Sequence, residues 1–418
     1  MTTATAPAPM FPLDTTEITG NFITVHTIAT YTGVNMNRDF DGLPKQIVFG
    51  GVPRLRVSAQ SKARAIRVWH RNNSTDSSHN AVSTRLLPQQ TSRALVNQHG
   101  IDPADALPAA VVTVLAAGIG IDLAKPGQTK AITPVPADAA DRLAKLAKEH
   151  WEELKGARDL AETAITAALK AAADKEGGKR GAKKAPAADA DKAPAFGAAQ
   201  LGLPVAYVAE ARAAFAPGTT TEMALFGRML TELPEGEVYS SVQVAHAIGV
   251  DPYEEITDRY TVMDDWQDLG VFGAANTGEK YLASGTLYSY TSLDRRALRT
   301  TLAKSGVGDD RTEELAKDAE RLFVNGCVLA VPSGNRSRTG SAVLPTVAVA
   351  CATDLPLTAA AAFETVVDGP AGLEAAYRLG SYLRRTSRFS PLHGGKALWM
   401  PPVDADAPEF PASITVEV

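Results

Sequence analysis

Seven cationic side chains in one short window are the residues best suited to chemistry. Between Gly42 and Thr75 there is no aspartate or glutamate, and the window contains Lys45, Arg54, Arg56, Lys62, Arg64, Arg67 and Arg71. The window carries +7 in 34 residues and the whole chain carries −5, so the remainder carries −12. A local basic patch on an acidic protein can bind phosphate groups while the rest of the surface repels polyanions. The alternative is a solvated face whose acidic partners lie elsewhere in the sequence.

The common enzyme motifs are absent from the sequence. It has no GxxxxGK[ST], HExxH, CxxC or GxSxG motif, and Gly118-Ile119-Gly120 lacks the remaining glycine of a dinucleotide fingerprint. No two of the seven histidines have the spacing of metal ligands. The Asp264-Asp265 pair has the chemistry to hold Mg²⁺ but is more typical of a helix N-terminus or a solvated turn. We therefore predict no metal and no cofactor.

His26 is the one candidate for catalysis. It lies in a run of β-branched residues near the basic window, where an imidazole can act as a general base on an RNA 2′-hydroxyl. A lone histidine on a strand is more often packed and hydrogen-bonded. The residues are thus compatible with two functions, a non-catalytic binding protein and a metal-independent endoribonuclease.

Length and composition are those of an ordinary globular protein. The 418 residues are 45% hydrophobic and 21% charged, which allows two or three domains or one domain with large insertions. Cys327 and Cys351 are too few to define a disulfide framework. No apolar run approaches 18 residues, and the first 13 residues do not resemble a secretory signal, so we predict a cytoplasmic protein without a membrane partner.

The basic window is expected to span a strand and a helix. Alternating residues predict strands over 22–31 and 53–57, with Arg54 and Arg56 on one face of the second. Ser58 is the expected helix N-cap, with Ser61 as its rival. The backbone amides at that helix start are candidates to bind a phosphate.

The rest of the chain predicts mixed structure around a helical middle. Leucine spacing predicts one or two long helices over 138–173, followed by a low-complexity linker over 174–194. Strands are expected over 280–290 and 322–332, and helices over 311–321, 357–367 and 373–385.

Residues 21–67 resemble a known family. The Asn37-Arg38-Asp39 turn, Lys45, Phe49-Gly50-Gly51 and the pattern from Arg54 to Arg67 are similar to the N-terminal signature of the CasC-type backbone subunit of the type I-E CRISPR Cascade complex, in the RAMP superfamily. Further matching blocks lie at 226–229, 245–247, 260–265, 284–288, 354–357 and 362–364. The lysine at position 62 stands one residue earlier than in the family pattern, which turns it by about 100° around a helix.

The resemblance implies an α/β (α+β) fold. It consists of an RNA-recognition-motif-like (ferredoxin-like) palm, a helical fingers insertion and a β-hairpin thumb. On this sequence the palm is 21–71 and 267–418, behind a flexible tail over 1–20. The fingers are 72–225, including the linker 174–194, and the thumb region is 226–266.

The resemblance also implies a function and the residues for it. Several copies of a non-catalytic subunit would polymerise along the spacer of a guide RNA (crRNA), hold its phosphate backbone and present its bases to target DNA in antiviral defence. Other copies and other Cascade subunits would be partners. The implied RNA contacts are Asn37, Arg38, Lys45, Arg54, Arg56, Ser58, Gln60, Lys62, Arg64 and Arg67. The implied thumb residues, which would kink the guide duplex, are Met229, Tyr260, Thr261 and Met263. A monomeric single-strand RNA chaperone is the remaining alternative.

Overall fold

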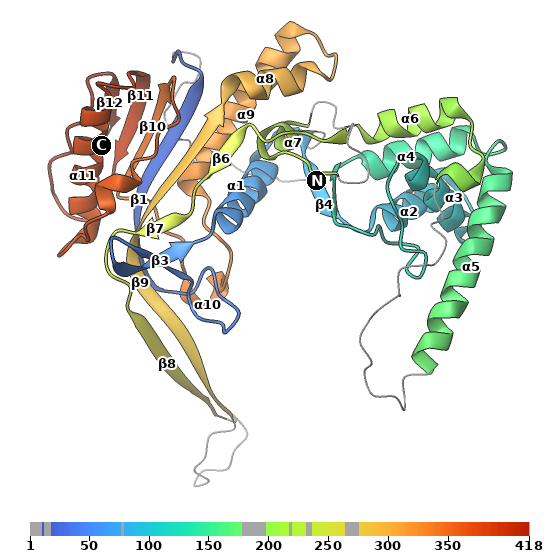
Figure 1. Cartoon of the computed structure of the whole chain (residues 1–418), viewed down its shortest axis with the longest axis horizontal. Helices are drawn as coiled ribbons and strands as arrows, with labels where there is room; N and C mark the ends of the chain where they lie inside the picture. The colour runs from blue at the N-terminus through green and yellow to red at the C-terminus, as the bar shows by residue number, and fades with distance from the viewer. Residues whose placement is uncertain are drawn as a thin grey trace. The chain divides into compact units, whose positions relative to one another are not determined.

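The structure is a computed structural model that describes residues 11, 18–76, 79–177, 198–216, 220–230, 236–263 and 276–417 (Figure 1). Most of the predicted tail 1–20, the linker from 178 to 194, and Asp264-Asp265 lie outside the described residues. The chain forms two compact units. The first combines the residues up to Thr75 with Ser240–Ala303 and those from Val307 on; the second is Asp76–Tyr239 with Lys304–Gly306.

The first unit is built on a largely antiparallel sheet. Its centre is β1 (Phe22–Val34), which pairs with β10 (Val347–Thr353) on one side and β9 (Asn276–Asp294) on the other. β9 pairs in turn with β6 (Val242–Val244) and β7 (Ala247–Gly249). Helix α1 (Ala59–Asn73) follows β1, and α9 (Asp309–Leu329) joins β9 to β10. This β-α-β-β-α-β order, with β10 beside β1, is the ferredoxin-like arrangement, so the predicted α+β fold is confirmed.

Helices cover both faces of the central strands. On one face α1 packs against α9, where Gly326 allows Ile66 and Trp69 to approach closely. On the other face α11 (Ala371–Thr386) buries Leu379 and Leu383 against Tyr288 and Val349 of the sheet. All seven residues of β10 are buried. The described central strands therefore have no open face on which bases can stack, unlike a sheet that reads RNA through exposed aromatic residues.

Additional strands extend the sheet at both ends. Beyond β10 lie β11 (Leu392–Trp399) and then β12 (Ile414–Glu417), which is parallel to β11. Beyond β7 lie β3 (Val52–Val57) and β2 (Gln46–Phe49), joined by Gly50-Gly51. Both glycines have positive φ, as a two-residue hairpin turn requires. A Cβ on Gly50 would stand 1.8 Å from the carbonyl oxygen of Glu364.

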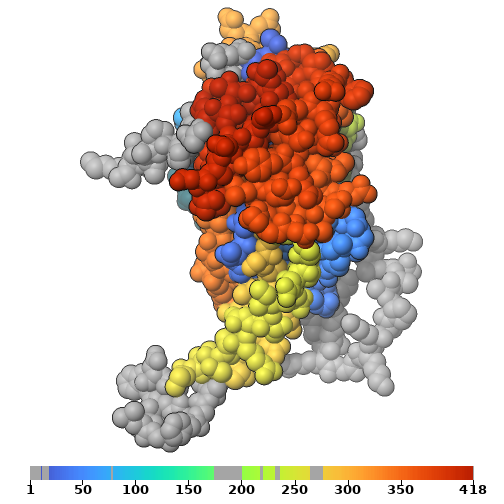
Figure 2. Space-filling view, turned by 90° about the vertical axis from the view of Figure 1, so that its left-hand side faces the viewer, coloured from blue at the N-terminus to red at the C-terminus, as the bar shows by residue number. Residues whose placement is uncertain are grey.

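A long hairpin projects from the sheet. Strand β8 (Glu255–Val262) pairs with the first half of β9, with Tyr260 opposite Gly278. Every residue of β8 is exposed, and Figures 1 and 2 show the hairpin extending away from the packed sheet. The sequence-based thumb range 226–266 contains β8, but the partner strand lies in the range assigned to the palm.

The second unit is mainly helical. It contains β4 (Ala81–Thr84), β5 (Thr133–Pro136) and a short 3₁₀ helix, η3 (Ala198–Leu201). Its α-helices are α2 (Leu87–His99), α3 (Pro103–Ala116), α4 (Ala139–Glu149), α5 (Lys155–Gly177), α6 (Val205–Phe215) and α7 (Thr221–Phe226). Their core includes Val111, Leu143, Tyr207 and Phe215. Helices α4 and α5 confirm the prediction for 138–173. The unit runs from Asp76 to Tyr239, against 72–225 in the sequence-based division.

Two predicted elements are wrong. The expected strand 322–332 is the second half of α9. This half is buried from Leu322 to Val328, so it lacks the exposed polar face, repeated every three to four residues, that marks an amphipathic helix. The expected helix 357–367 is only the short 3₁₀ helix η5 (Ala360–Phe363). Helices α8 (Arg295–Ala303) and α10 (Arg336–Thr339) were not expected.

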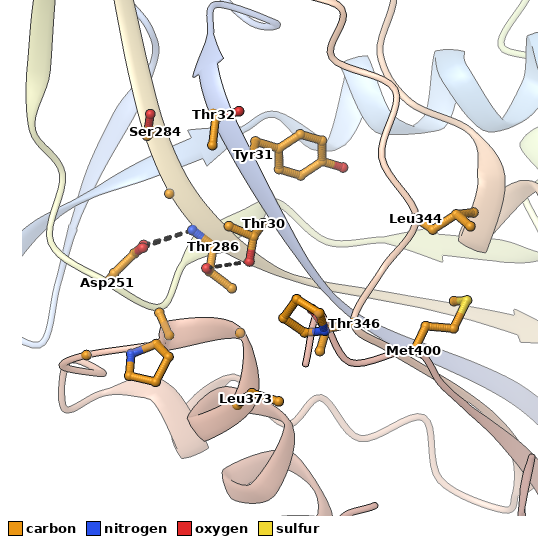
Figure 3. A pocket seen from close by; sticks show the side chains of 16 residues that line it. Thr30, Tyr31, Thr32, Asp251, Ser284, Thr286, Leu344, Thr346, Leu373 and Met400 are labelled. Atoms are coloured by element: carbon orange, nitrogen blue, oxygen red, sulfur yellow. Dashed lines mark hydrogen bonds between the residues drawn. The ribbon is translucent and has the colours of Figure 1, made fainter. Parts of the chain in front are cut away.

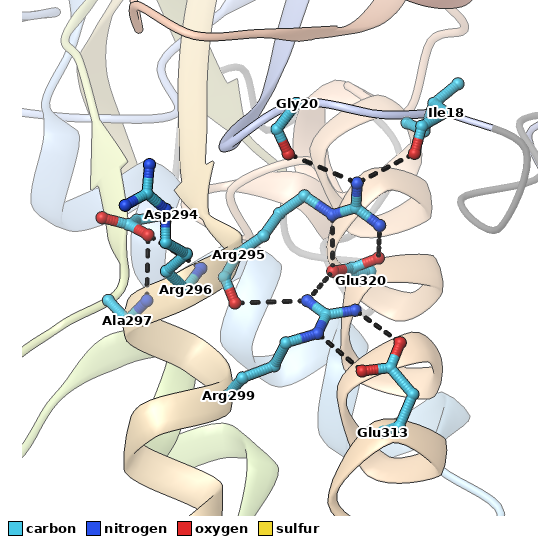
Figure 4. A network of polar contacts seen from close by, with 9 residues as sticks. All are labelled: Ile18, Gly20, Asp294, Arg295, Arg296, Ala297, Arg299, Glu313 and Glu320. Atoms are coloured by element: carbon cyan, nitrogen blue, oxygen red, sulfur yellow. Dashed lines mark hydrogen bonds and ion pairs between the residues drawn. The ribbon is translucent and has the colours of Figure 1, made fainter.

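A buried ion-pair network fixes α8 to α9 (Figure 4). Glu320 on α9 is fully buried and accepts from the guanidinium groups of Arg295, at 2.9 Å, and Arg299, at 2.6 Å. Arg295 also donates to the carbonyl oxygens of Ile18 and Gly20, just before β1. The network thus ties the start of β1 to the helix pair that follows β9.

Candidate nucleic-acid interface

The loop between β1 and β2 is held against the start of α1. Asn37 makes the key connection, because its side-chain Oδ1 accepts a 2.8 Å bond from the backbone N of Ser58 while its carbonyl oxygen accepts from the backbone N of Lys45. Within the loop, the carboxylate of Asp39 accepts from the backbone N of Asp41 and of Leu43. The loop therefore has a defined conformation beside the helix.

The first turn of α1 is capped by its own neighbours. Ser58 is the N-cap, as predicted, and its Oγ accepts from the backbone N of Ser61. The backbone N of Ala59 donates to Nδ1 of His246 at 2.8 Å. With the amide of Ser58 held by Asn37, three of the amides that were candidates for a phosphate are already bonded. Phosphate binding here must depend mainly on side chains.

Four cations surround this capped helix start. Arg38 and Arg64 are exposed, and Lys45 and Arg56 are half-buried. Among the residues that the structure describes, none of the four has a carboxylate within ion-pair distance. Burial lowers the pKa of His246, and the positive charges of Arg56 and Lys45 lower it further. These two cations therefore lie near His246 and near the backbone amide of Ala59, which donates to it. Within the described part of the chain, these four cations thus lack the acidic partners that the solvated-face alternative required.

Arg54 differs from its neighbour Arg56. Its side chain is fully buried, and its guanidinium donates to the carbonyl oxygens of Gly249, Val250 and Glu364. Burial lowers its pKa, although the carboxylate of Asp251 opposes that shift. This geometry corrects the sequence-based assignment, because the guanidinium already joins three segments of the fold and is not available to a phosphate.

Lys62 is also buried, at 8% exposure. Its Nζ donates to the carbonyl oxygen of Cys327 on α9 at 3.4 Å, and burial lowers its pKa. The shifted lysine thus points into the helix pair, which corrects its assignment as an RNA contact. Gln60 is exposed and Arg67 is half-buried on the same helix.

Two cations that sequence analysis missed lie on α10, and one of them, Arg336, lines a cavity together with residues of α1. Arg336 and Arg338 are exposed on α10, and among the described residues neither has an ion-pair partner. The loop before them approaches the β1–β2 loop so closely that a Cβ on Gly334 would be 2.1 Å from the carbonyl oxygen of Met36. The sequence signal that could have indicated these two residues is a pair of arginines in a segment rich in serine, glycine and asparagine. His246 was noticed only as part of a matching block.

Comparison with known proteins identifies the family. Residues 23–399 match the model of the family described as CT1975-like protein. The chain belongs to the CT1975-like family. One similar solved chain, from a structure titled "CRISPR RNA-guided surveillance complex, pre-nicking", is 26% identical with a TM-score of 0.71, and the match covers 95% of this chain and 96% of that chain. Another, titled "CRISPR RNA-guided surveillance complex", is 25% identical with a TM-score of 0.63 and the same coverage. No curated protein matches.

These matches agree with the predicted resemblance to a CRISPR complex subunit. The type I-E and CasC-type assignments are finer than the matches and stay predictions. No helix in the described part of this CT1975-like chain has the length and apolarity to cross a membrane, and no cluster of metal-binding side chains occurs among the described residues.

The predicted thumb residues belong to two different units. Tyr260, Thr261 and Met263 lie on or beside the projecting β8, whereas Met229 belongs to the second unit. The ring of Tyr260 lies over Gly278 and within 4.3 Å of the Lys280 ammonium group, on its own hairpin. Met263 is 74% exposed. Met263 is therefore better placed than Tyr260 to contact another molecule.

His26 does not have the environment of a catalytic base. It is 1% exposed, and its Nδ1 is 2.9 Å from the hydroxyl of Tyr288. That hydroxyl also accepts a hydrogen bond from the backbone N of Ala359. Burial lowers the pKa of His26 to about 3. In this fold an RNA 2′-hydroxyl cannot reach the imidazole without opening the layer between the sheet and α11.

Proposed function

We propose that this CT1975-like protein is a non-catalytic, RNA-binding backbone subunit of a type I-E CRISPR Cascade surveillance complex. The observation that carries the proposal is the group of four cations around the start of α1, Arg38, Lys45, Arg56 and Arg64, without carboxylate partners among the described residues. The titles of the two similar structures describe RNA-guided complexes, which supports a guide RNA (crRNA) as the ligand.

The chemistry favours recognition of the RNA backbone over its bases. Arginine and lysine supply charge for phosphates, and the exposed amide of Gln60 supplies neutral hydrogen bonds to sugar or phosphate oxygens. Because helices cover both faces of the described central strands, these strands offer no stacking platform for a base reader. A subunit of this kind can hold guides of any sequence and leave target selection to base pairing with DNA.

The projecting hairpin supports a second part of the proposal. Its exposed residues include Ile256, Val262 and Met263, and exposed apolar side chains grouped on one element are typical of an interaction site. In a filament of copies along the guide, this hairpin would lie across the RNA held by the next copy and interrupt base stacking there. A bulky side chain such as Met263 fills the gap that an unstacked base leaves.

Co-expression with a CRISPR array and its partner subunits tests the proposal. We expect intact guide RNA to co-purify with several copies of this chain, and the double variant Arg38→Ala/Lys45→Ala to reduce the RNA recovered. The control is Arg388→Ala, which removes an exposed arginine just after α11 that has no ion-pair partner among the described residues. A monomer without RNA would refute the proposal, as would cleavage of the guide precursor by the chain alone. A monomer that binds RNA would favour the chaperone alternative.

A further inference from the structure

His246 lies between β6 and β7, beside the start of α1. Val57 at the end of β3 pairs with Ala247 at the start of β7, so the residues that follow β3 lie next to the residue that precedes β7. His246 is half-buried there, and its Nδ1 accepts a 2.8 Å bond from the backbone N of Ala59, the first residue of α1. A titratable side chain therefore holds an amide that could otherwise bind a phosphate.

This hydrogen bond sets the protonation state of the imidazole. Because a backbone N–H can only donate, Nδ1 carries a lone pair and the ring proton is on Nε2. A proton on Nδ1 would place two donors against each other and break the bond to Ala59. The partial positive charge at the N-terminus of α1 also disfavours an imidazolium. At neutral pH the chain without RNA therefore has a neutral His246 and a capped Ala59 amide.

The charged side chains around His246 in the described part of the chain are cations. Burial lowers its pKa, and Arg56 on β3 and Lys45 before β2 lower it further. The elements around the ring supply no counter-charge, because β2, β3, β6, β7 and α1 contain no aspartate or glutamate. On β9, the carbonyl oxygen of Tyr290 accepts from the backbone N of Ala245, and burial raises the pKa of its phenol to about 12, so that side chain stays neutral.

The carboxylates of the adjoining segments are bonded elsewhere. Asp251, the first carboxylate after β7, lines a separate cavity of about 580 Å³, where both its oxygens accept from the backbone N of Thr286 (Figure 3). On β9, Glu279 pairs with Arg259, and Asp294 accepts from two backbone amides at the start of α8. Among the described residues, these carboxylates therefore leave an imidazolium at His246 without a counter-ion.

A bound phosphate would change this balance. Its negative charge offsets the field of Lys45 and Arg56, which then no longer lowers the pKa of the imidazole. The phosphate also accepts the Ala59 N–H that the ring must release when it binds a proton. Phosphate binding and protonation of His246 thus favour each other.

We propose that His246 is a proton-linked positioning residue of the RNA surface. In the free chain its neutral ring holds the Ala59 amide; when an RNA phosphate binds beside Lys45 and Arg56, Nδ1 takes up one proton from solvent and releases the amide to that phosphate. This inference rests on the proposed function, since it needs a phosphate at these cations. It goes beyond that function, because RNA affinity then rises as the pH falls through the pKa of His246 in the complex and levels off below its pKa in the free chain.

Calorimetric titration of the full chain with an oligouridine counts the protons. Uracil binds no proton between pH 6 and pH 8, so any uptake comes from the protein. The binding enthalpies in Pipes and in Bis-Tris, two buffers of different ionisation enthalpy, together give the number of protons taken up at pH 6.5. We expect uptake of up to one proton by the wild type. Its affinity should rise by about threefold or more from pH 8 to pH 6, since linkage to one proton allows up to about tenfold for each pH unit.

Two matched variants assign the proton. His246→Asn keeps an oxygen that can accept from the Ala59 amide but cannot take up a proton, so it should bind RNA without proton uptake and with a flatter pH profile. His393→Asn removes another half-buried histidine of the same unit, which lies on β11 and bonds to Asp354. This control should keep the uptake and the pH profile of the wild type.

The outcomes separate this inference from the proposed function. Wild type that binds RNA without proton uptake would overturn the role of His246 and leave the backbone-binding function standing, whether or not the variants fold. Equal uptake by His246→Asn and wild type would also overturn it, because another group would then be the proton acceptor. Loss of uptake in both variants would show a response that is not particular to His246, with the same consequence. If the folded chain binds no RNA at either pH, both proposals fail.

Discussion

The burial of His26 predicts a defined pH dependence of stability. The pKa of this imidazole is about 3 in the folded chain and about 6.5 when exposed. Between these values the unfolded chain binds a proton that the folded chain excludes, so the free energy of unfolding falls as the pH falls below about 6.5. For one such group the loss between pH 8 and pH 5 is about 2 kcal/mol.

The substitution His26→Phe isolates this contribution. Phenylalanine keeps an aromatic ring in the site but removes the titration and the hydrogen bond between His26 and Tyr288. The loss of that hydrogen bond costs about 1 kcal/mol at pH 8. The variant should therefore be less stable than the wild type at pH 8 and more stable at pH 5. Because the chain has two units, unfolding in urea should be followed by the fluorescence of Trp399, which is buried in the first unit, with the other three tryptophans replaced by phenylalanine.

A control with the opposite sign is available in the second unit. His150 forms hydrogen bonds with Glu153 and Glu210, and these carboxylates raise its pKa. Its contribution to the free energy of unfolding is therefore present at low pH and is lost as the pH rises through the pKa of His150 in the folded chain. His150→Gln should leave the signal from Trp399 unchanged. If His26→Phe and wild type lost the same free energy between pH 8 and pH 5, His26 would be titrating in the folded chain. The argument against a catalytic imidazole would then fail.

Three further substitutions test other parts of the structure. Lys62→Met should leave RNA affinity unchanged in fluorescence anisotropy and should not lower the free energy of unfolding in urea. Because burial lowers the pKa of Lys62 in the folded chain, the wild type should gain stability relative to this variant as the pH rises toward 10.5. A loss of RNA affinity would show that the ammonium group is accessible. Glu320→Gln should cost about 3–5 kcal/mol in thermal unfolding, because it removes the fully buried carboxylate that pairs with both Arg295 and Arg299. The partly exposed Glu313→Gln should cost about 1 kcal/mol, and equal costs would contradict the burial argument. Gly50→Ala should destabilise the chain more than Gly51→Ala, since both have positive φ but only Gly50 meets a backbone carbonyl, and the reverse order in chemical unfolding would refute the close approach.

Local signals in the sequence predicted the elements with clear periodicity or caps. Ser58 was recognised as an N-cap from residue type alone, and helices α4 and α5 from their leucine spacing. The apolar run from Leu322 predicts a strand, because a helix buried on all sides loses its amphipathic pattern. That information exists only in the packing of α9 against α1 and the sheet.

The candidate site was predictable in position but not residue by residue. Arg54 and Arg56 are two residues apart and are expected on the same face of the strand. Only Arg54 is buried, because the distant segment around Glu364 packs over its side chain. Lys62 was a recoverable error, since it is four residues before Ile66 and therefore shares the buried stripe of α1. Arg336 reaches the site only through the tertiary fold, so a local reading of the sequence cannot place it there.

The salt dependence of RNA binding by the purified chain tests the central claim most directly. We predict that the logarithm of the affinity for a single-stranded RNA falls linearly with the logarithm of salt concentration. Each phosphate contact contributes about −0.7 to the slope. Arg38→Ala/Lys45→Ala should therefore flatten the slope by about 1.4, while Arg388→Ala leaves it unchanged. Folded protein without measurable RNA affinity at low salt, or equal slopes for the double variant and wild type, would contradict the account.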